Sequence, residues 1–249
     1  MMAEIGALEV VTQNRLVNLF QKDLGYIYIG NLEDRTDNSN INETLLREYL
    51  VSKKYNENQI NQAIRQLLLE ANNQGKDLYE ANKEIYGLLR YGINVSNEVG
   101  EHRSYVNLID WHNPMANNFY IAEEVTIFGN KERRPDLVIY VNGIALGVIE
   151  LKRSKVSVHE GIRQNIRNQQ DNEIHRFFTT IQLIFAGSDS EGLYYGVIKT
   201  PEKFWLRWKE ENPQGENELD YNCKNFFDKT RFLEFIQDMI IFDAGIKKA

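Results

Sequence analysis

The sequence predicts an α/β protein in which helices come first and a mixed β-sheet with one inserted helix follows. Over residues 1–100, apolar residues recur at the spacing of amphipathic helices; from about residue 105 they gather in short runs rich in Val, Ile, Tyr and Phe, which are typical of strands. With 249 residues, 42% of them hydrophobic, the chain can bury a core as one domain, or as one domain with a smaller lobe.

Apolar spacing and capping residues define the expected helices. Asn40, followed three residues later by Glu43, resembles a capping box at the start of a helix. Ser157 and Glu160 form a similar pair before the helix inserted in the sheet. The expected helices span residues 7–22, 41–50, 60–71, 76–92, 157–170 and 231–242.

Short β-rich runs define the expected strands, which span residues 105–111, 118–128, 136–141, 144–151, 181–188 and 193–198. Polar segments at 33–40 and 211–220 are expected to be loops. The resulting division is a mainly helical region over 1–100, a sheet-containing core over 101–200 and a helical segment over 201–249.

Composition excludes several classes of protein. The single cysteine, Cys223, rules out a disulfide framework and fits a reducing compartment. Neither an apolar run of roughly 20 residues nor a basic-then-apolar leader is present, so we expect a cytoplasmic protein with no membrane partner. A net charge of −7 argues against a protein that simply coats nucleic acid.

Three charged residues flank two apolar runs that the Asn142-Gly143 dipeptide joins as a hairpin. Asp136 opens the first run, and Glu150 and Lys152 close the second. Because side chains alternate along a strand, Glu150 and Lys152 share one face. Two convergent carboxylates suit a hard divalent cation such as Mg²⁺, and a lysine can steady a nucleophilic water or the charge that gathers on phosphorus. A buried salt bridge without chemistry is the alternative interpretation.

The stretch RRPDLVIYVNGIALGVIELK, residues 133–152, resembles the signature of the PD-(D/E)xK nucleases. In particular, the chain is similar to the N-terminal domain of the R (restriction) subunit of type I restriction–modification enzymes. Three further stretches match the family in the same order along the chain, two before the signature and one after it: LYEANKEIYGLLRYGINV, VNLIDWHNPMANNFYIAEEVTIFGN and IRQNIRNQQ. The resemblance therefore covers most of residues 10–200. It implies a restriction-endonuclease-like core, a mixed sheet flanked by helices.

The resemblance also implies roles for individual residues. Asp136 and Glu150 match the metal-binding carboxylates, and Lys152 matches the catalytic lysine. Gln164 matches a glutamine of the family that acts at the site, whereas Asn168 stands where the family has a tyrosine. Related nucleases add an acidic residue from an early helix, for which Glu9 is a candidate.

The implied cofactor is Mg²⁺, and the implied partners are double-stranded DNA and the methyltransferase and specificity subunits of the type I complex. The family's R subunit uses ATP through motor domains. The one candidate phosphate loop, Gln74-Gly75-Lys76-Asp77, lacks an earlier glycine five residues before Gly75 and has Asp after the lysine. We therefore expect ATP to act only through motor domains absent from this chain. The chain would be either the nuclease fragment of a longer subunit, which we favour, or a stand-alone relative.

Two functional hypotheses remain. The first is a Mg²⁺-dependent DNA endonuclease, and the second is a non-catalytic docking module whose Asp/Glu/Lys cluster is a structural ion pair. Residues 131–167 contain eight basic and four acidic residues, either as a solvated surface of mixed charge or as a weak, salt-sensitive contact for DNA. We expect DNA to bind there.

The nuclease hypothesis also demands an irregularity in the hairpin. With a two-residue turn at Asn142-Gly143 and an unbroken ladder, Asp136 would face Ile149 and lie on the opposite side of the sheet from Glu150. Either a three-residue loop with Gly143 left-handed or a bulge at Gly147 would return Asp136 to the side of Glu150.

Overall fold

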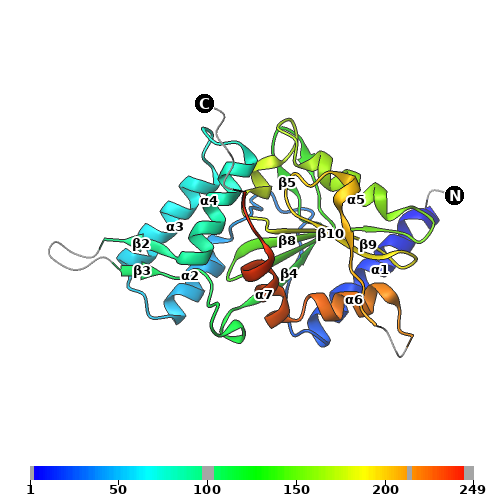
Figure 1. Cartoon of the computed structure of the whole chain (residues 1–249), viewed down its shortest axis with the longest axis horizontal. Helices are drawn as coiled ribbons and strands as arrows, with labels where there is room; N and C mark the ends of the chain where they lie inside the picture. Colours follow the sequence, from blue (N-terminus) through cyan, green and yellow to red (C-terminus); the bar gives the residue numbers. More distant parts are fainter. Residues whose placement is uncertain (1–2, 97–103, 212–214, 244–249) are drawn as a thin grey trace.

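Seven strands form one mixed sheet in the order β1-β4-β7-β8-β9-β10-β11 (Figure 1). The structure, a computed structural model, describes residues 3–96, 104–211 and 215–243. The strands are β1 (Ile27–Asn31), β4 (Phe119–Glu123), β7 (Leu137–Val141), β8 (Ile144–Lys152), β9 (Leu183–Ser188), β10 (Gly192–Gly196) and β11 (Leu206–Arg207). β1 runs parallel to β4 and β8 parallel to β9, and the other neighbours are antiparallel. The predicted α/β class with a mixed sheet is confirmed.

Helices cover both faces of this sheet. In Figure 1, α5 (Val158–Asn168) lies above it, and α1 (Ala3–Lys22) and α6 (Glu218–Phe226) lie below, followed by α7 (Lys229–Met239). Side chains of the central strands alternate between the two layers: Leu137 packs with the α1 and α6 layer, and Val138 packs with α5. Burial on both faces explains why β7 and β8 read as nearly continuous apolar runs.

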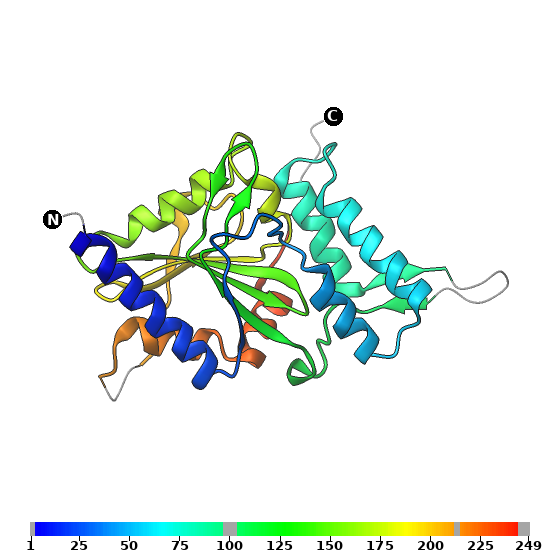
Figure 2. The ribbon, with the colours of Figure 1, turned by 180° about the vertical axis from the view of Figure 1, so that it is seen from behind.

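Three further helices pack beside the sheet, as Figure 2 shows from behind: α2 (Glu43–Ser52), α3 (Glu57–Ala71) and α4 (Leu78–Tyr91). Two small antiparallel pairs complete the strands, namely β2 (Ile93–Val95) with β3 (Ser104–Val106), and β5 (Ile127–Phe128) with β6 (Glu132–Arg133). Short 3₁₀ helices lie at η1 (Pro114–Ala116), η2 (His175–Thr179) and η3 (Glu202–Phe204). Within the described residues, no helix is both long and apolar enough to cross a membrane.

The first hundred residues contribute to both parts of the molecule. α1 and β1 lie with the sheet, whereas α2 to α4 form the helical layer beside it. β1 was not predicted, because a short edge strand is specified mainly by its partner, here β4. α6 was also missed, because its polar first turn resembles a loop.

The cap of α2 differs from the prediction. Asn42, rather than Asn40, caps the helix by accepting a hydrogen bond from the Leu45 amide. Asn40 is buried and donates instead to the Thr179 hydroxyl at 3.0 Å. Tertiary packing therefore moves the helix start by two residues. Ser157 caps α5 as predicted.

Candidate active site

A one-residue bulge places Asp136 and Glu150 on the same side of the sheet. The β7–β8 turn has two residues, Asn142 and Gly143, both left-handed with φ of 53° and 85°. Val141 faces Ile144 and Tyr140 faces Ala145, but Ile139 faces Gly147, so that Leu146 is left over. Of the two irregularities that the sequence left open, the three-residue loop is absent and a bulge is present, with Leu146, next to the expected Gly147, as the extra residue.

The bulge restores the register that the site requires. Beyond it, Leu137 faces Ile149, so the next pair outward is Asp136 with Glu150. The backbone groups around the bulge find partners from other segments, since unpaired buried groups would be costly. Ala145 N–H donates to the Asn40 carbonyl at 2.8 Å, and the Ala145 carbonyl accepts from the Thr180 hydroxyl at 2.7 Å.

The three charged side chains meet at the ends of these strands. Asp136 Oδ2 accepts a hydrogen bond from Leu151 N–H at 2.6 Å. Lys152 Nζ lies 3.0 Å from Glu150 Oε1 and 2.8 Å from the Leu151 carbonyl oxygen. Glu150 is 1% exposed. From α1, Glu9 places Oε1 3.5 Å from Lys152 Nζ, so the sequence candidate for an early acid does reach the cluster.

Burial makes the ionised form of both carboxyl groups unfavourable. Desolvation, opposed by Lys152 and the Leu151 amide, raises the pKa of Asp136 to about 7. Desolvation and the neighbouring Asp136 raise the pKa of Glu150 well above its usual value. Burial acts to lower the pKa of Lys152, but Glu150 and Asp136 outweigh it and the pKa is raised. One lysine thus faces one buried acid, Glu150, and one half-buried acid, Asp136, which is a surplus of acidic groups over basic ones.

That surplus fits a divalent cation. In the described hydrogen bonds, Asp136 and Glu150 each use one oxygen, which leaves the other for a metal. The described residues contain no group of three or more His, Cys, Asp or Glu that could hold a metal ion. Asp136 and Glu150 are two carboxylates, and water molecules would complete the shell of a cation that they held. Mg²⁺ commonly binds through one or two carboxylates while retaining several waters.

A pocket of about 560 Å³ opens over the cluster. Its walls come from α1, α5 and the segment before β7, which lie around the end of β8 in Figure 2. Eleven residues line it. Three are uncharged, namely Val10, Gln13 and Gln164, and the others are five acids and three bases: Glu9, Glu124, Glu132, Asp136, Glu150, Arg133, Arg134 and Lys152. A phosphodiester would meet more carboxyl groups than cations here, so an added positive charge would favour its entry.

Gln164 and Asn168 differ in their relation to the pocket. Gln164 lies on α5, is half-buried and lines the pocket wall. Asn168 is 1% exposed at the end of the same helix, and its Oδ1 has no hydrogen-bond partner among the described residues. The structure therefore brings Gln164 to the candidate site and leaves Asn168 in the core beneath the helix.

Two residues that the sequence did not single out also reach the pocket. Glu124 has a left-handed backbone, with φ of 50°, which is uncommon for a residue other than glycine. Its carboxylate binds Arg134 at 2.6 Å, and Arg134 also pairs with Glu33. The only local sequence signal that could have placed Arg134 at the pocket was the Arg133-Arg134 dipeptide before Pro135-Asp136. Without the fold, this dipeptide is typical of ordinary surface charge.

An ion-pair cluster fixes the helix that carries Glu9. Arg15 of α1 pairs with Asp189 in the β9–β10 turn and, at 3.0 Å, with Asp220 of α6. Thr12 donates to Asp189 at 3.0 Å. These contacts tie α1 to two other elements just two turns from Glu9.

Arg15→Ala is expected to lower the free energy of unfolding by about 1 kcal/mol, because two partly exposed carboxylates lose their partner. It should also weaken any activity of the pocket several-fold by loosening α1. Arg231→Ala is the matched control, since Arg231 binds Glu210 in a similar pair outside the pocket lining. Thermal unfolding and activity should both change for Arg15→Ala, whereas only the melting temperature should change for the control.

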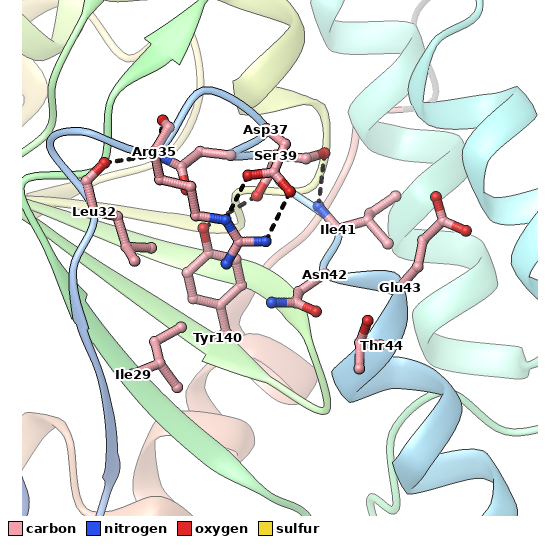
Figure 3. A pocket seen from close by; sticks show the side chains of 11 residues that line it. Ile29, Leu32, Arg35, Asp37, Ser39, Ile41, Asn42, Glu43, Thr44 and Tyr140 are labelled. Carbon is pink, nitrogen blue, oxygen red and sulfur yellow. Dashed lines mark hydrogen bonds and ion pairs between the residues drawn. The ribbon is translucent and has the colours of Figure 1, made fainter.

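A second pocket, of about 310 Å³, lies beside the start of α2 (Figure 3). Arg35 and Asp37 bind each other in it, with Nη2 to Oδ2 at 3.0 Å. The Tyr140 hydroxyl donates to the Ser39 carbonyl at 3.1 Å. The Tyr140 contact ties the loop after β1 to the sheet, whereas the Arg35–Asp37 pair is internal to the loop. None of the sequence-predicted site residues lines this pocket.

Comparisons with known proteins agree with the resemblance drawn from the sequence. Residues 8–203 match the family described as "Type I restriction enzyme R protein N terminus". A putative type I restriction enzyme endonuclease subunit, MjaVIIIP, of Methanocaldococcus jannaschii is 28% identical over 64% of this chain and 16% of its own length. The EcoprrI endonuclease subunit of Escherichia coli is 25% identical over 56% of this chain and 47% of its own.

A further relative covers more of the chain. The SauMSSORF170P endonuclease subunit of Staphylococcus aureus is 23% identical over 79% of the chain, and the match spans 21% of that subunit. The chain thus corresponds to less than half the length of each of these relatives. Because the family match extends over well more than half of the chain, the chain belongs to the family of type I restriction enzyme R protein N-termini.

Proposed function

We propose that this chain is a Mg²⁺-dependent endonuclease domain that hydrolyses phosphodiester bonds of double-stranded DNA within a type I restriction enzyme. The observation that carries the proposal is the bulged hairpin, which sets Asp136 on the side of the sheet where Glu150 binds Lys152. The curated relatives are named endonuclease subunits, and this supports the same class of reaction here.

The residues would divide the chemistry between them. Asp136 and Glu150 would hold Mg²⁺, which when bound supplies positive charge against the phosphate oxygens. Lys152 would orient the attacking water or stabilise the charge that develops on phosphorus. In the hydrolysis, the attacking water releases a proton to solvent as its oxygen bonds to phosphorus. The bond from phosphorus to the leaving sugar oxygen breaks, and that oxygen takes up a proton from solvent. Gln164 would position the DNA or support the cluster from α5.

The non-catalytic docking module is less well supported. A structural ion pair needs one acid for one lysine, whereas here two carboxyl groups with raised pKa values share Lys152. Such an arrangement is unfavourable for stability, and perturbed pairs of this kind gather at functional sites.

In the type I setting, the methyltransferase and specificity subunits would be the partners of the protein that carries this domain. The specificity subunit would select the DNA sequence, and ATP would be used by motor domains outside this chain.

Metal binding tests the proposal directly. Isothermal titration of the purified chain with Mn²⁺ or Mg²⁺ should show a cation site that Asp136→Asn removes. Asp110→Asn is the control for the same substitution, because Asp110 is an aspartate outside the pocket lining, where it pairs with Lys53. Equal cation affinity in wild type and Asp136→Asn would exclude the assignment of Asp136 as a ligand.

A further inference from the structure

The basic residues between 131 and 167 fall into two groups. Five pair with carboxylates: Lys131, Arg133, Arg134, Lys152 and Arg163. The other three have no ion pair or side-chain hydrogen bond among the described residues: Arg153, Lys155 and Arg167. Lys155 and Arg167 are exposed, and Arg153 is half-buried. The sequence shows these eight residues as one basic block, but only three of them keep a positive charge that no carboxylate of the described residues pairs with.

The three unpaired cations lie in segments that adjoin the Lys152 and Gln164 side of the pocket, although none is among the residues that line it. Arg153 and Lys155 lie in the segment between the end of β8 and the start of α5. Arg167 is in the last turn of α5, three residues after Gln164 of the pocket wall. Figure 2 shows α5 rising from this segment along one side of the sheet, away from α1.

The opposite wall has a different character. α1 contributes Glu9, Val10 and Gln13 to the pocket lining, which are acidic, apolar and neutral. Lys131 and Arg133 are held by one buried acid, Glu173, which is 3% exposed. A side chain that already pairs with a carboxylate gains little by binding a phosphate. An unpaired one can neutralise a DNA phosphate and so release counterions from the DNA, which favours binding.

We propose that Arg153, Lys155 and Arg167 form a phosphate row, which holds the backbone of one strand of duplex DNA along α5 beside the pocket. This inference rests on the proposed function, since the row matters only if the pocket receives DNA. From Val158 to Arg167 the helix rises roughly 14 Å, and a B-DNA strand has one phosphate per about 3.4 Å of axis. The stretch of α5 that separates Arg167 from the other two cations therefore matches about four nucleotide steps.

A stabilising role for Arg167 at the helix end is a separate effect. A cation in the last turn of a helix adds a few tenths of a kcal/mol to stability through the helix dipole. This changes the melting temperature slightly and leaves the salt dependence of DNA binding untouched, so the two roles give different readouts.

The matched control lies on the same helix. Arg163 is also exposed, four residues before Arg167, but it binds Glu160 at 2.6 Å and Glu202 at 2.9 Å. Replacing either arginine by glutamine removes the same formal charge from the same helix. Only Arg167→Gln removes an unpaired one.

Fluorescence anisotropy with a duplex of about 30 base pairs tests the row, with Ca²⁺ replacing Mg²⁺ and again with chelator. In a plot of log affinity against log salt, each of Arg153→Gln, Lys155→Gln and Arg167→Gln is expected to reduce the slope by about 0.9, and the triple variant by close to three times that. Affinity should fall equally for unrelated DNA sequences. Arg163→Gln should leave the slope near wild type.

A slope unchanged in the triple variant, or equally reduced by Arg163→Gln, would overturn the row. Thermal unfolding of each variant verifies the fold. The row can fail while cleavage still depends on Asp136 and Lys152, in which case the nuclease proposal stands. Conversely, a reduced slope in a protein whose cleavage does not depend on those residues supports the row and rejects the proposed function.

Discussion

The rate of DNA cleavage is expected to fall about a hundred- to a thousandfold when Lys152 is replaced by alanine. This is the size of effect seen when one group that stabilises a transition state is removed. Asp136→Ala and Glu150→Ala should abolish cleavage, because each removes one of the two carboxylates that are proposed to bind the metal. Asp136 and Lys152 lie at the ends of strands, where truncation leaves little cavity, so the fold of these two variants should persist. Glu150 is buried, and thermal unfolding verifies the fold of Glu150→Ala. In the assembled enzyme, the ATPase should persist as well.

Initial rates of plasmid cleavage measure this effect, with the variants reconstituted in the full type I complex. The loss should appear in the rate at saturating DNA rather than in DNA affinity, since the interaction removed belongs to the transition state. Lys76→Ala is the control, because Lys76 pairs with Glu70 in a similar lysine–glutamate contact outside the pocket lining. Wild-type cleavage by Lys152→Ala would refute the catalytic assignment.

The metal-free protein is expected to gain stability when Asp136 becomes asparagine. Burial raises the pKa of Asp136 from an ordinary 3.8 to about 7. Between these values the folded state holds a proton that the unfolded state has lost, so wild-type stability falls as pH rises from about 4 to 7. Each pH unit in this window removes up to about 1.4 kcal/mol.

Asparagine carries no charge to desolvate and can still accept the hydrogen bond from Leu151. At pH 8, Asp136→Asn should therefore unfold roughly 5 °C or more above wild type, which corresponds to about 2 kcal/mol. The difference should shrink toward pH 4 and vanish below about pH 3, where Asp136 is protonated in both states. Thermal unfolding across pH 4–8 in chelator measures it.

Asp110→Asn should behave in the opposite way. Despite partial desolvation, Lys53 and the Asn113 amide lower the pKa of Asp110, so its charge supports the fold above the ordinary pKa of aspartate, and that support is lost as pH falls. At pH 8 this variant should melt below wild type. If Asp136→Asn also melted below wild type, Asp136 would be a stabilising partner of Lys152, as the docking-module hypothesis requires.

The sequence by itself determined the strands of the central hairpin and the residues at their ends. The apolar runs of β7 and β8 are long, buried on both faces and interrupted by a turn dipeptide, so local pattern alone locates them. Asp136, Glu150 and Lys152 then stand out because charged residues at the ends of buried strands need a partner. The demand for an irregular backbone followed from the two-residue period of a strand.

Only the tertiary structure decided which irregularity answers that demand. Asn142 and Gly143 are both left-handed and allow a two-residue turn. The extra residue is Leu146, because Asn40 and Thr180, which are distant in sequence, supply hydrogen bonds to the backbone beside the bulge. The same holds for Glu9, which nothing local marks and which reaches Lys152 because Arg15 ties α1 to α6. Pairings between distant segments depend on how whole elements pack, and a local pattern does not contain them.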